Sequence, residues 1–288
     1  MYRKILVPLS TDGCGMDAGV DGAFRIARLF GARVEAFYAR PNPEDVLIVL
    51  GRGVVGTTLE KALREVQTKI AKDRNAAYDH LQTLCRAAGI PMVESASASD
   101  PLSVLWHETA GQLPDLVATE GRFADFFVLS GSTHDGGAFW RPVFETALFV
   151  STRPVILMPD RRVEGVGTTV FVAWNGSAQA MRAVTSALPF LRNAHSILIG
   201  TVEADDVPPG DAERLRDYLA EQDVDARVIH KAGGGRTAGE MLLDLARCAG
   251  ADLLVMGGYG HSRVREWALG GATRDVLAAA AMPVLMMH

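Results

Sequence analysis

The sequence predicts an α/β protein made of two similar halves, each built on a mostly parallel sheet. Short apolar runs alternate with longer segments of helical apolar spacing, and this order of elements produces parallel sheets. The alternation stops near residue 160 and begins again after residue 167. Short segments also recur at corresponding places in the two halves, which indicates an internal duplication.

In the first half, continuous apolar runs predict buried strands. Helical spacing predicts helices, two of which end before Gly31 and Gly89, since glycine commonly follows the last turn. Residues 40–56 carry prolines and glycines, and we predict a loop there. The predicted strands are residues 4–9, 33–38, 91–94, 123–129 and 154–158, and the predicted helices are residues 17–30, 59–88, 101–113 and 142–150.

The second half repeats this order after a charged, glycine-containing stretch that is typical of a linker. We therefore place the two domains at residues 1–160 and 168–288, joined by a linker at residues 161–167. The predicted strands of the second half are residues 169–174, 196–202, 226–230, 253–256 and 283–287, and its predicted helices are residues 178–191, 211–221, 238–249 and 273–281.

Three pairs of matching segments support the duplication. They are ADFFVLSGSTH (124–134) and ADLLVMGGYGH (251–261), RPVILMP (153–159) and MPVLMMH (282–288), and ILVPLS (5–10) and VFVAWN (170–175). Matches at three ordered positions are not expected by chance. We interpret the chain as a tandem repeat.

The composition argues against several classes of protein. The chain has 288 residues, a formal net charge of −5 and a pI near 5.8, and its scattered basic residues form no patch for nucleic acid or an anionic membrane. No run of about 20 apolar residues predicts a membrane helix. Cys14, Cys85 and Cys248 lack the spacing of a disulfide framework or a zinc site. Because the first residues also lack a signal-peptide pattern, we expect a cytoplasmic protein with reduced thiols.

Two glycine clusters stand out in residues 255–273. Gly257, Gly258 and Gly260 follow a predicted strand, and Gly270 and Gly271 precede a predicted helix. Such an arrangement gathers unpaired backbone N–H groups at a helix N-terminus, which suits an anionic group such as a nucleotide phosphate. The glycines are also compatible with tight turns that hold no ligand. We favour the binding interpretation because ligands sit at the carboxyl ends of parallel strands.

The spacing Gly257-x2-Gly260-x9-Gly270, preceded by ADLLVMG and followed by a helix and a closing PVLMM strand, resembles the universal stress protein family. The resemblance covers both halves and identifies a tandem, two-domain member. It implies a fold of the adenine nucleotide alpha hydrolase-like type, in which each doubly wound domain holds a five-stranded, mostly parallel sheet between helices. It also implies a stress-response protein that binds ATP, with any Mg2+ held mainly through the phosphates.

The resemblance assigns roles to individual residues. Gly257, Gly260 and Gly270 match the three glycines of the family's ATP-binding motif. Gly271 stands where the family has Ser or Thr, so one phosphate-binding hydroxyl is missing, although its N–H remains and Thr273 offers a hydroxyl nearby.

The remaining contacts follow from the same comparison. The family's first strand ends in an acid near the adenine. Asn175 replaces that acid here, and an amide can still both donate to and accept from an adenine edge. The backbone around Val172 would meet the adenine, Ala272 would offer an N–H to the phosphates, and His261 would reach them or lie in a solvated loop. Trp174 would flank the base, although core packing is the commoner role of such a tryptophan.

The first half departs further from the motif. Ser130 and Thr133 take the places of the first two glycines, and Arg141 and Pro142 take those of the second cluster, counted back from the last strand. Side chains block the close backbone approach that a phosphate needs, and proline has no N–H to offer. Ser10 replaces the acid. We predict that the first site is degenerate.

The family's pairing mode implies partners as well. Its domains associate through their last strands, so residues 154–158 and 283–287 would pair within one chain as a pseudo-dimer, and two chains would be able to form a homodimer. We predict no catalytic or metal-binding residue, because nothing positions a water or supplies a general base, and expect a binding module with at most slow ATP hydrolysis. Two groups, residues 132–135 and residues 107–108, resemble pieces of a hydrolytic triad, but no nucleophile elbow is present and we interpret them as solvated turns.

Two alternatives stay open. One is a scaffold or interaction protein of the same fold that binds no nucleotide, because the Ser or Thr and the acid are both missing. The other is an enzyme that transfers an adenylyl group, for which His261 and Arg263 would be the nearest charged candidates.

Overall fold

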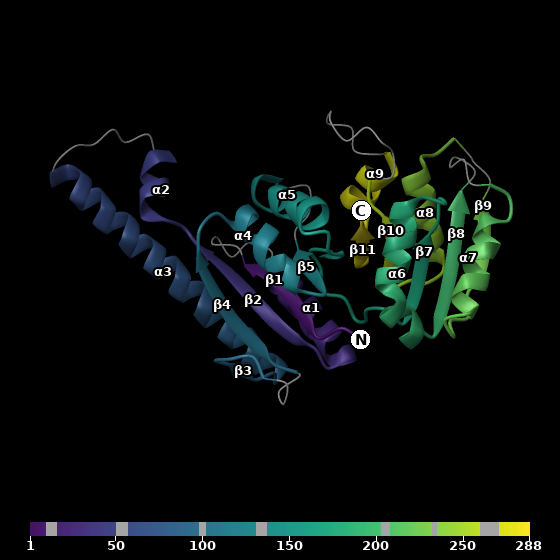
Figure 1. The fold of residues 1–288 in the computed structure, drawn as a ribbon, viewed down its shortest axis with the longest axis horizontal. Helices are drawn as coiled ribbons and strands as arrows, with labels where there is room; N and C mark the ends of the chain where they lie inside the picture. Colours follow the sequence, from purple (N-terminus) through teal and green to yellow (C-terminus); the bar gives the residue numbers. More distant parts are fainter. Residues whose placement is uncertain are drawn as a thin grey trace.

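The computed structural model describes residues 1–9, 16–49, 57–97, 102–130, 137–202, 208–231, 235–259 and 271–288. The described strands form one continuous sheet of 11 strands in the order β3-β4-β2-β1-β5-β6-β11-β10-β7-β8-β9. All neighbouring strands are parallel except β6 and β11, which are antiparallel. Figure 1 shows the first half to the left of this junction and the second half to the right. The α/β class and the mostly parallel sheet agree with the prediction.

The first half contributes six of these strands and the second half five. The strands are β1 (Lys4–Leu9), β2 (Arg33–Arg40), β3 (Met92–Val93), β4 (Val104–Ala110), β5 (Phe126–Ser130), β6 (Val155–Met158), β7 (Thr169–Ala173), β8 (Ser196–Val202), β9 (Arg227–Lys231), β10 (Leu253–Gly257) and β11 (Val284–Met287). The helices are α1 (Met16–Phe30), α2 (Pro43–Val49), α3 (Thr57–Ala88), α4 (Leu113–Glu120), α5 (Gly137–Glu145), α6 (Ala178–Asn193), α7 (Asp211–Ala220), α8 (Ala238–Cys248) and α9 (Gly271–Ala279), with a 3-10 turn η1 (Gly121–Phe123) and a π-helical turn η2 (Thr146–Val150).

Helices cover both faces of the sheet, as a doubly wound fold requires. Apolar side chains of α1, α3, α6 and α7 are buried against one face. Those of α4, α5, α8 and α9 are buried against the other. In the second half every predicted strand and helix is present, with ends within two residues of the prediction.

Two predictions for the first half were wrong. The helix expected over residues 101–113 is instead strand β4, which pairs along its whole length with β2, and the helix follows as α4. On the strand, His107 and Glu108 alternate between the two faces of the sheet and find charged partners there. The loop expected over residues 40–56 contains helix α2, which begins at Pro43, a residue whose fixed φ suits a first helical position. The extra strand makes the first half six-stranded rather than five-stranded.

The repeated Ala-Asp pair has the same structural role in both halves. Asp252 accepts hydrogen bonds from the backbone N–H groups of Gly167 (3.0 Å) and Thr169 (2.9 Å), at the start of β7. Asp125 accepts from the N–H groups of Arg3 (2.6 Å) and Lys4 (2.8 Å), at the start of β1. Each aspartate therefore fixes the beginning of the first strand of its half.

The two halves share a continuous core at the junction. Ile156 of β6 lies opposite Leu285 of β11. On one face of the sheet, Phe190 of α6 packs edge-on against Phe30 of α1, with ring centroids 4.8 Å apart, and against Tyr2 at 5.5 Å. Because Phe190 is fully buried among rings of the first half, the halves form one packed body.

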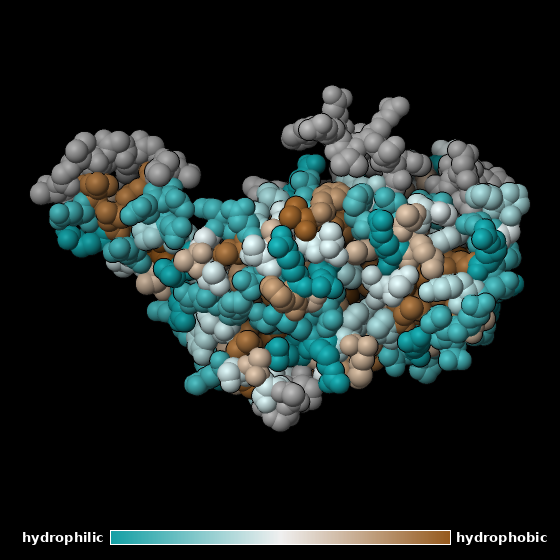
Figure 2. Space-filling view, viewed as in Figure 1, coloured by the Kyte–Doolittle hydropathy of each residue, from teal (hydrophilic) through white to brown (hydrophobic). Residues whose placement is uncertain are grey.

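An arm extends from the first half. Helix α3 runs past the end of the sheet, and α2 packs against its far part (Figure 1). Figure 2 shows apolar surface near the tip of this arm, and Leu47 of α2 and Ala62 of α3 are buried. Although α3 has 32 residues, it is rich in charged side chains. Within the described part of the chain, no helix is both long and apolar enough to span a membrane.

Candidate functional site

The candidate site lies where the strand order of the second half reverses. β7 is the first strand of this half along the chain and β10 the fourth, yet they are neighbours, with Ala173 opposite Met256. Helix α6 begins after β7, and α9 begins after the glycine segment that follows β10. Ligands of open parallel sheets bind in the crevice outside such strand ends. This edge therefore brings two helix N-termini to one place.

Gly257, the first glycine of the motif, is required by packing. A Cβ atom at this position would lie 2.5 Å from the backbone N of Ala180 and 2.8 Å from the backbone C of Gln179, both in the first turn of α6. Real Cβ atoms essentially never come within 3.0 Å of another atom, so a side chain would push the helix away. The glycine lets the N-terminus of α6 lie directly on the end of β10.

The next two residues form a fixed turn. The N–H of Gly258 donates to the carbonyl oxygen of Met287 at 2.8 Å, and Tyr259 adopts a left-handed backbone conformation with φ of 59°. A non-glycine residue in that conformation costs about 1–2 kcal/mol, so surrounding contacts must hold it. One such contact is the hydroxyl of Thr273, which accepts from the N–H of Tyr259 at 3.4 Å. Thr273 is buried, and its hydroxyl supports the turn through this hydrogen bond. The sequence did not suggest this role.

The ring of Tyr259 packs against the first half. Its centroid lies 4.8 Å from that of Phe149 in η2, and the same Phe149 ring lies 4.8 Å from the ring of His288. His288 in turn lies within hydrogen-bond distance, 3.1 Å, of the carbonyl oxygen of Gly258. Burial, with a smaller contribution from the charge of Glu145, raises the pKa of the Tyr259 hydroxyl to about 12.

Helix α9 begins at Gly271, directly after the glycine segment. The first four N–H groups of a helix have no partner within it, and those at Gly271, Ala272 and Thr273 belong to this set. Among the described residues, no atom would lie within 4 Å of a Cβ atom at Gly271. The position that lacks the family's hydroxyl therefore has room for one.

Asn175 lies at the surface after β7. Its Oδ1 atom accepts from the N–H and the hydroxyl of Ser177, at 3.2 and 2.7 Å. Ser177 is the N-cap of α6 and accepts from the N–H of Ala180. Asn175 therefore helps to start α6, and its remaining polar group is the side-chain NH2, which can donate to an adenine nitrogen but cannot accept.

Two predicted contacts are not brought to the site. Val172 is fully buried one residue before the end of β7, opposite Ile199 of β8 and Val255 of β10, so its backbone lies within the sheet. Trp174 is buried and donates from Nε1 to Asp211 at 3.0 Å. Packing, the commoner role of a tryptophan here, is the one that Trp174 has.

Several predicted residues lie outside the described part of the chain. In the second half these are Gly260, His261, Arg263 and Gly270. In the first half they are Ser10, Ser132, Thr133, His134 and Asp135.

The corresponding edge of the first half is built differently. Ser130 takes the position that Gly257 has in the second half. The strand end and the helix are again in close contact, but here the glycine belongs to the helix: a Cβ at Gly19 of α1 would lie 2.8 Å from Ser130 Oγ. Only residues 131–136 separate β5 from α5, whereas residues 258–270 separate β10 from α9. Arg141 and Pro142 lie inside α5 rather than at its start. The segment that would wrap a phosphate is therefore much shorter in the first half.

A cluster of polar side chains around the buried Glu35 was not predicted from the sequence. Glu35 of β2 has a side chain that is only 4% exposed, and its two oxygens lie 2.7 Å from Lys4 Nζ and 2.5 Å from His107 Nδ1. The other ring nitrogen of His107 lies 3.2 Å from the hydroxyl of Thr109. Burial alone would raise the pKa of Glu35, but hydrogen bonds from Lys4 and His107 outweigh it and lower that pKa. The interpretation of residues 107–108 as a solvated turn was wrong, and the glutamate within an apolar strand was the available signal.

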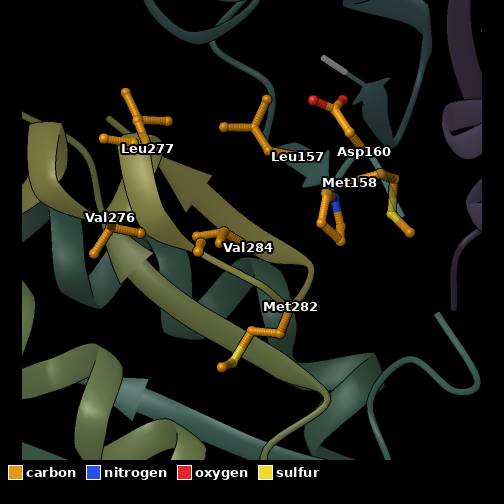
Figure 3. Close-up of a pocket in the computed structure, with 10 residues that line it drawn as sticks. Leu157, Met158, Asp160, Val276, Leu277, Met282 and Val284 are labelled. Carbon is orange, nitrogen blue, oxygen red and sulfur yellow. The ribbon is translucent and has the colours of Figure 1, made fainter. Parts of the chain in front are cut away.

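A small cleft opens between the halves at the far end of α9 from the glycines (Figure 3). It has a volume of about 70 Å3 and is lined mainly by apolar side chains, including Met158 of β6, Leu277 of α9 and Met282. Ligand pockets are usually at least about 300 Å3, so the cleft is too small for a nucleotide. Counted back from the last strand of each half, Ala278 here takes the place that Phe149 has in the first half.

Filling this cleft should stabilise the protein. We expect Ala278→Leu to raise the free energy of unfolding by about 1 kcal/mol, because the added methyl groups would cover apolar surface of both halves. Urea unfolding followed by circular dichroism measures the change. Ala279→Leu, on the same helix but outside the cleft and exposed, is the matched control and should change little. Equal effects of the two substitutions would contradict the expectation.

The described residues include no group of three or more His, Cys, Asp or Glu side chains arranged to hold a metal ion.

Residues 168–288 match the model of the universal stress protein family. Among solved structures, the chain is similar to a universal stress protein from Archaeoglobus fulgidus DSM 4304, with a TM-score of 0.72 and 15% identity over 99% of this chain and 97% of that one. It is also similar to a functionally unknown protein from Pseudomonas aeruginosa PAO1, with a TM-score of 0.57 and 13% identity over 99% of this chain and 92% of that one. No curated protein matches the sequence significantly.

Proposed function

Because residues 168–288 of this chain form a domain of the universal stress protein family, we propose that the chain is a cytoplasmic stress-response protein whose second half binds an adenine nucleotide, with ATP as the first candidate. The observation that carries the proposal is the meeting of two helix N-termini where the strand order of the second half reverses, one of them following the glycine motif. Helix N-termini with unpaired N–H groups favour phosphate.

Each part of the nucleotide has a candidate partner. The phosphates would lie over the first turn of α9, near the N–H groups of Gly271 and Ala272 and the motif glycines Gly260 and Gly270. The adenine would take a hydrogen bond from the side-chain NH2 of Asn175, since the Oδ1 atom of that residue already accepts from Ser177. Mg2+ would be held mainly by the phosphates, because the motif supplies no carboxylate.

The first half is proposed as a second domain of the same family whose site has been lost. Residues 1–160 would form this domain, residues 161–167 the linker, and residues 168–288 the binding domain, as expected of a tandem repeat. The short β5–α5 connection and Ser130 in place of a glycine support the loss of the site. The antiparallel pairing of β6 with β11 supports a pseudo-dimer within one chain. A homodimer of two chains is proposed from family resemblance alone.

Calorimetry with ATP, and separately with AMP, tests the nucleotide proposal. We expect saturable binding of ATP to the full chain and a higher melting temperature in its presence, because a ligand that binds only the folded state stabilises it. Absence of both heat and melting shift at millimolar ATP would overturn the proposal. That result would favour the scaffold alternative, which the packing role of Gly257 also fits. Formation of AMP or of an adenylylated product during incubation would favour an enzyme.

Restoring the missing hydroxyl should strengthen binding. We expect Gly271→Ser to tighten ATP binding about tenfold, because the position has space for the side chain and a hydrogen bond to a charged phosphate contributes about 1.5–3 kcal/mol. Gly271→Ala is the matched control, since it adds the same Cβ without the hydroxyl, and it should leave the affinity almost unchanged. If serine and alanine act alike, the hydroxyl does not meet a phosphate.

A further inference from the structure

The turn that leaves β10 in the second half is held partly by residues of the first half. Phe149 packs on the ring of Tyr259, and Leu148 is the side chain nearest to Gly258, where its Cδ2 atom would lie 3.1 Å from an added Cβ. Both first-half residues belong to η2, a π-helical turn at the end of α5. π-Helical turns are rare and often occur where a side chain serves a special purpose. η2 lies just before the junction strand β6, and its residue Phe149 contacts the second half.

The conformation that these contacts support is one that a tyrosine does not adopt readily. Tyr259 has φ of 59°, and such strained residues persist only where their surroundings determine them. Its N–H bonds to Thr273 in α9, and the carbonyl oxygen of the preceding Gly258 lies 3.1 Å from His288 Nδ1, whose ring also packs on Phe149. Phe149 therefore contacts both rings that flank the turn.

We propose that Phe149 is a positioning residue for the nucleotide site of the second half, so that the first half retains a supporting role although its own site is lost. The inference depends on the proposed nucleotide binding in the second half. Phe149 does not touch the expected ligand. It fixes the Gly258–Tyr259 turn, and through the bond from Tyr259 to Thr273 it relates that turn to the first residues of α9, where the phosphates would bind.

The test compares Phe149→Ala and Phe149→Leu with Val150→Ala in the full chain. Val150 is the neighbouring residue, is 53% exposed and is the matched control. The first readout needs no nucleotide: amide hydrogen exchange of the peptide that contains Gly258 and Tyr259. We expect faster exchange there in both Phe149 variants, unchanged exchange in β8, and wild-type behaviour in Val150→Ala.

A second nucleotide-free readout is the spectrophotometric titration of Tyr259, taken as the difference from a Tyr259→Phe background. Its pKa of about 12 should fall towards 10 in Phe149→Ala, because the hydroxyl loses part of its burial. Phe149→Leu keeps an apolar side chain, so it covers the case in which the alanine variant fails to fold.

The third readout is ATP affinity, which we expect to fall about tenfold in the Phe149 variants, within the usual range for coupling between sites. Unchanged exchange at the turn in both variants would overturn the inference, as would faster exchange with unaltered ATP affinity. If the wild-type protein binds no ATP, the proposed function fails, while the exchange and titration results still decide whether Phe149 holds the turn.

Discussion

Gly257→Ala is expected to destabilise the protein by about 3 kcal/mol and to abolish nucleotide binding. The added Cβ would lie 2.5 Å from the backbone of α6, where only movement of the helix can relieve the overlap, and overpacking of this kind typically costs about 1–3 kcal/mol. Movement of α6 would also displace Asn175, which starts that helix through Ser177. Urea unfolding measures the stability, and calorimetry with ATP measures the binding.

Gly271→Ala is the control for this effect. It makes the same chemical change in the same motif, but in the part of the chain that the structure describes the new Cβ would have no neighbour within 4 Å. Alanine at a helical position should be neutral or should stabilise the protein by about 0.5 kcal/mol. If both substitutions destabilise equally, the close contact between β10 and α6 is not the reason for glycine at position 257.

Lys4→Met should destabilise the protein by about 3 kcal/mol at pH 7. The substitution leaves the carboxylate of Glu35, whose side chain is 4% exposed, with the ring of His107 as its remaining hydrogen-bond partner, and breaking a buried ion pair in this way usually costs about 3–5 kcal/mol. Lys69→Met is the control, because its ion pair with Asp73 has a lysine that is 74% exposed and should contribute little. Urea unfolding of both variants at pH 7 makes the comparison.

The pH dependence of the same variant has a definite sign. In the wild-type protein the pKa of Glu35 is lowered by its hydrogen bonds, so Glu35 stabilises the fold above its ordinary value of 4.5, and this contribution is lost as the pH falls through the lowered pKa. Without Lys4 the effect of burial gains weight and that pKa rises. The difference in stability between wild type and Lys4→Met should therefore shrink between pH 7 and pH 4. A constant difference would show that Lys4 does not act through Glu35.

The second half was predictable because its elements follow each other closely and each has an unmixed pattern. The first half was not, because β4 carries polar residues that only the register with β2 explains: His107 lies within hydrogen-bond distance of Glu35, a buried residue of β2 that also pairs with Lys4. Pro43, Glu44 and Asp45 were a readable helix start that the surrounding glycines and prolines obscured.

The candidate site, like the fold, was only partly predictable from the sequence. The glycine pattern and the strand order located the edge of the sheet, since both follow from local sequence. The packing of Gly257 on Ala180 and the hydrogen bond from the N–H of Tyr259 to the hydroxyl of Thr273 both depend on how segments distant in sequence meet. Ser130 and Gly19 are the clearest example. In the first half the glycine of the close contact lies on the helix, whereas in the second half it lies on the strand, and an alignment of the strand segments alone could not reveal this difference.

The antiparallel junction of β6 and β11 also governs how the protein avoids aggregation. Each of these strands is an apolar segment, VILM and VLMM, that would be an exposed sheet edge in an isolated half and a template for pairing with other chains. Joining them leaves β3 and β9 as the outer strands of the described sheet. β3 is only two residues long, and β9 carries Arg227 and Lys231, so the two remaining edges are the ones least able to recruit another strand.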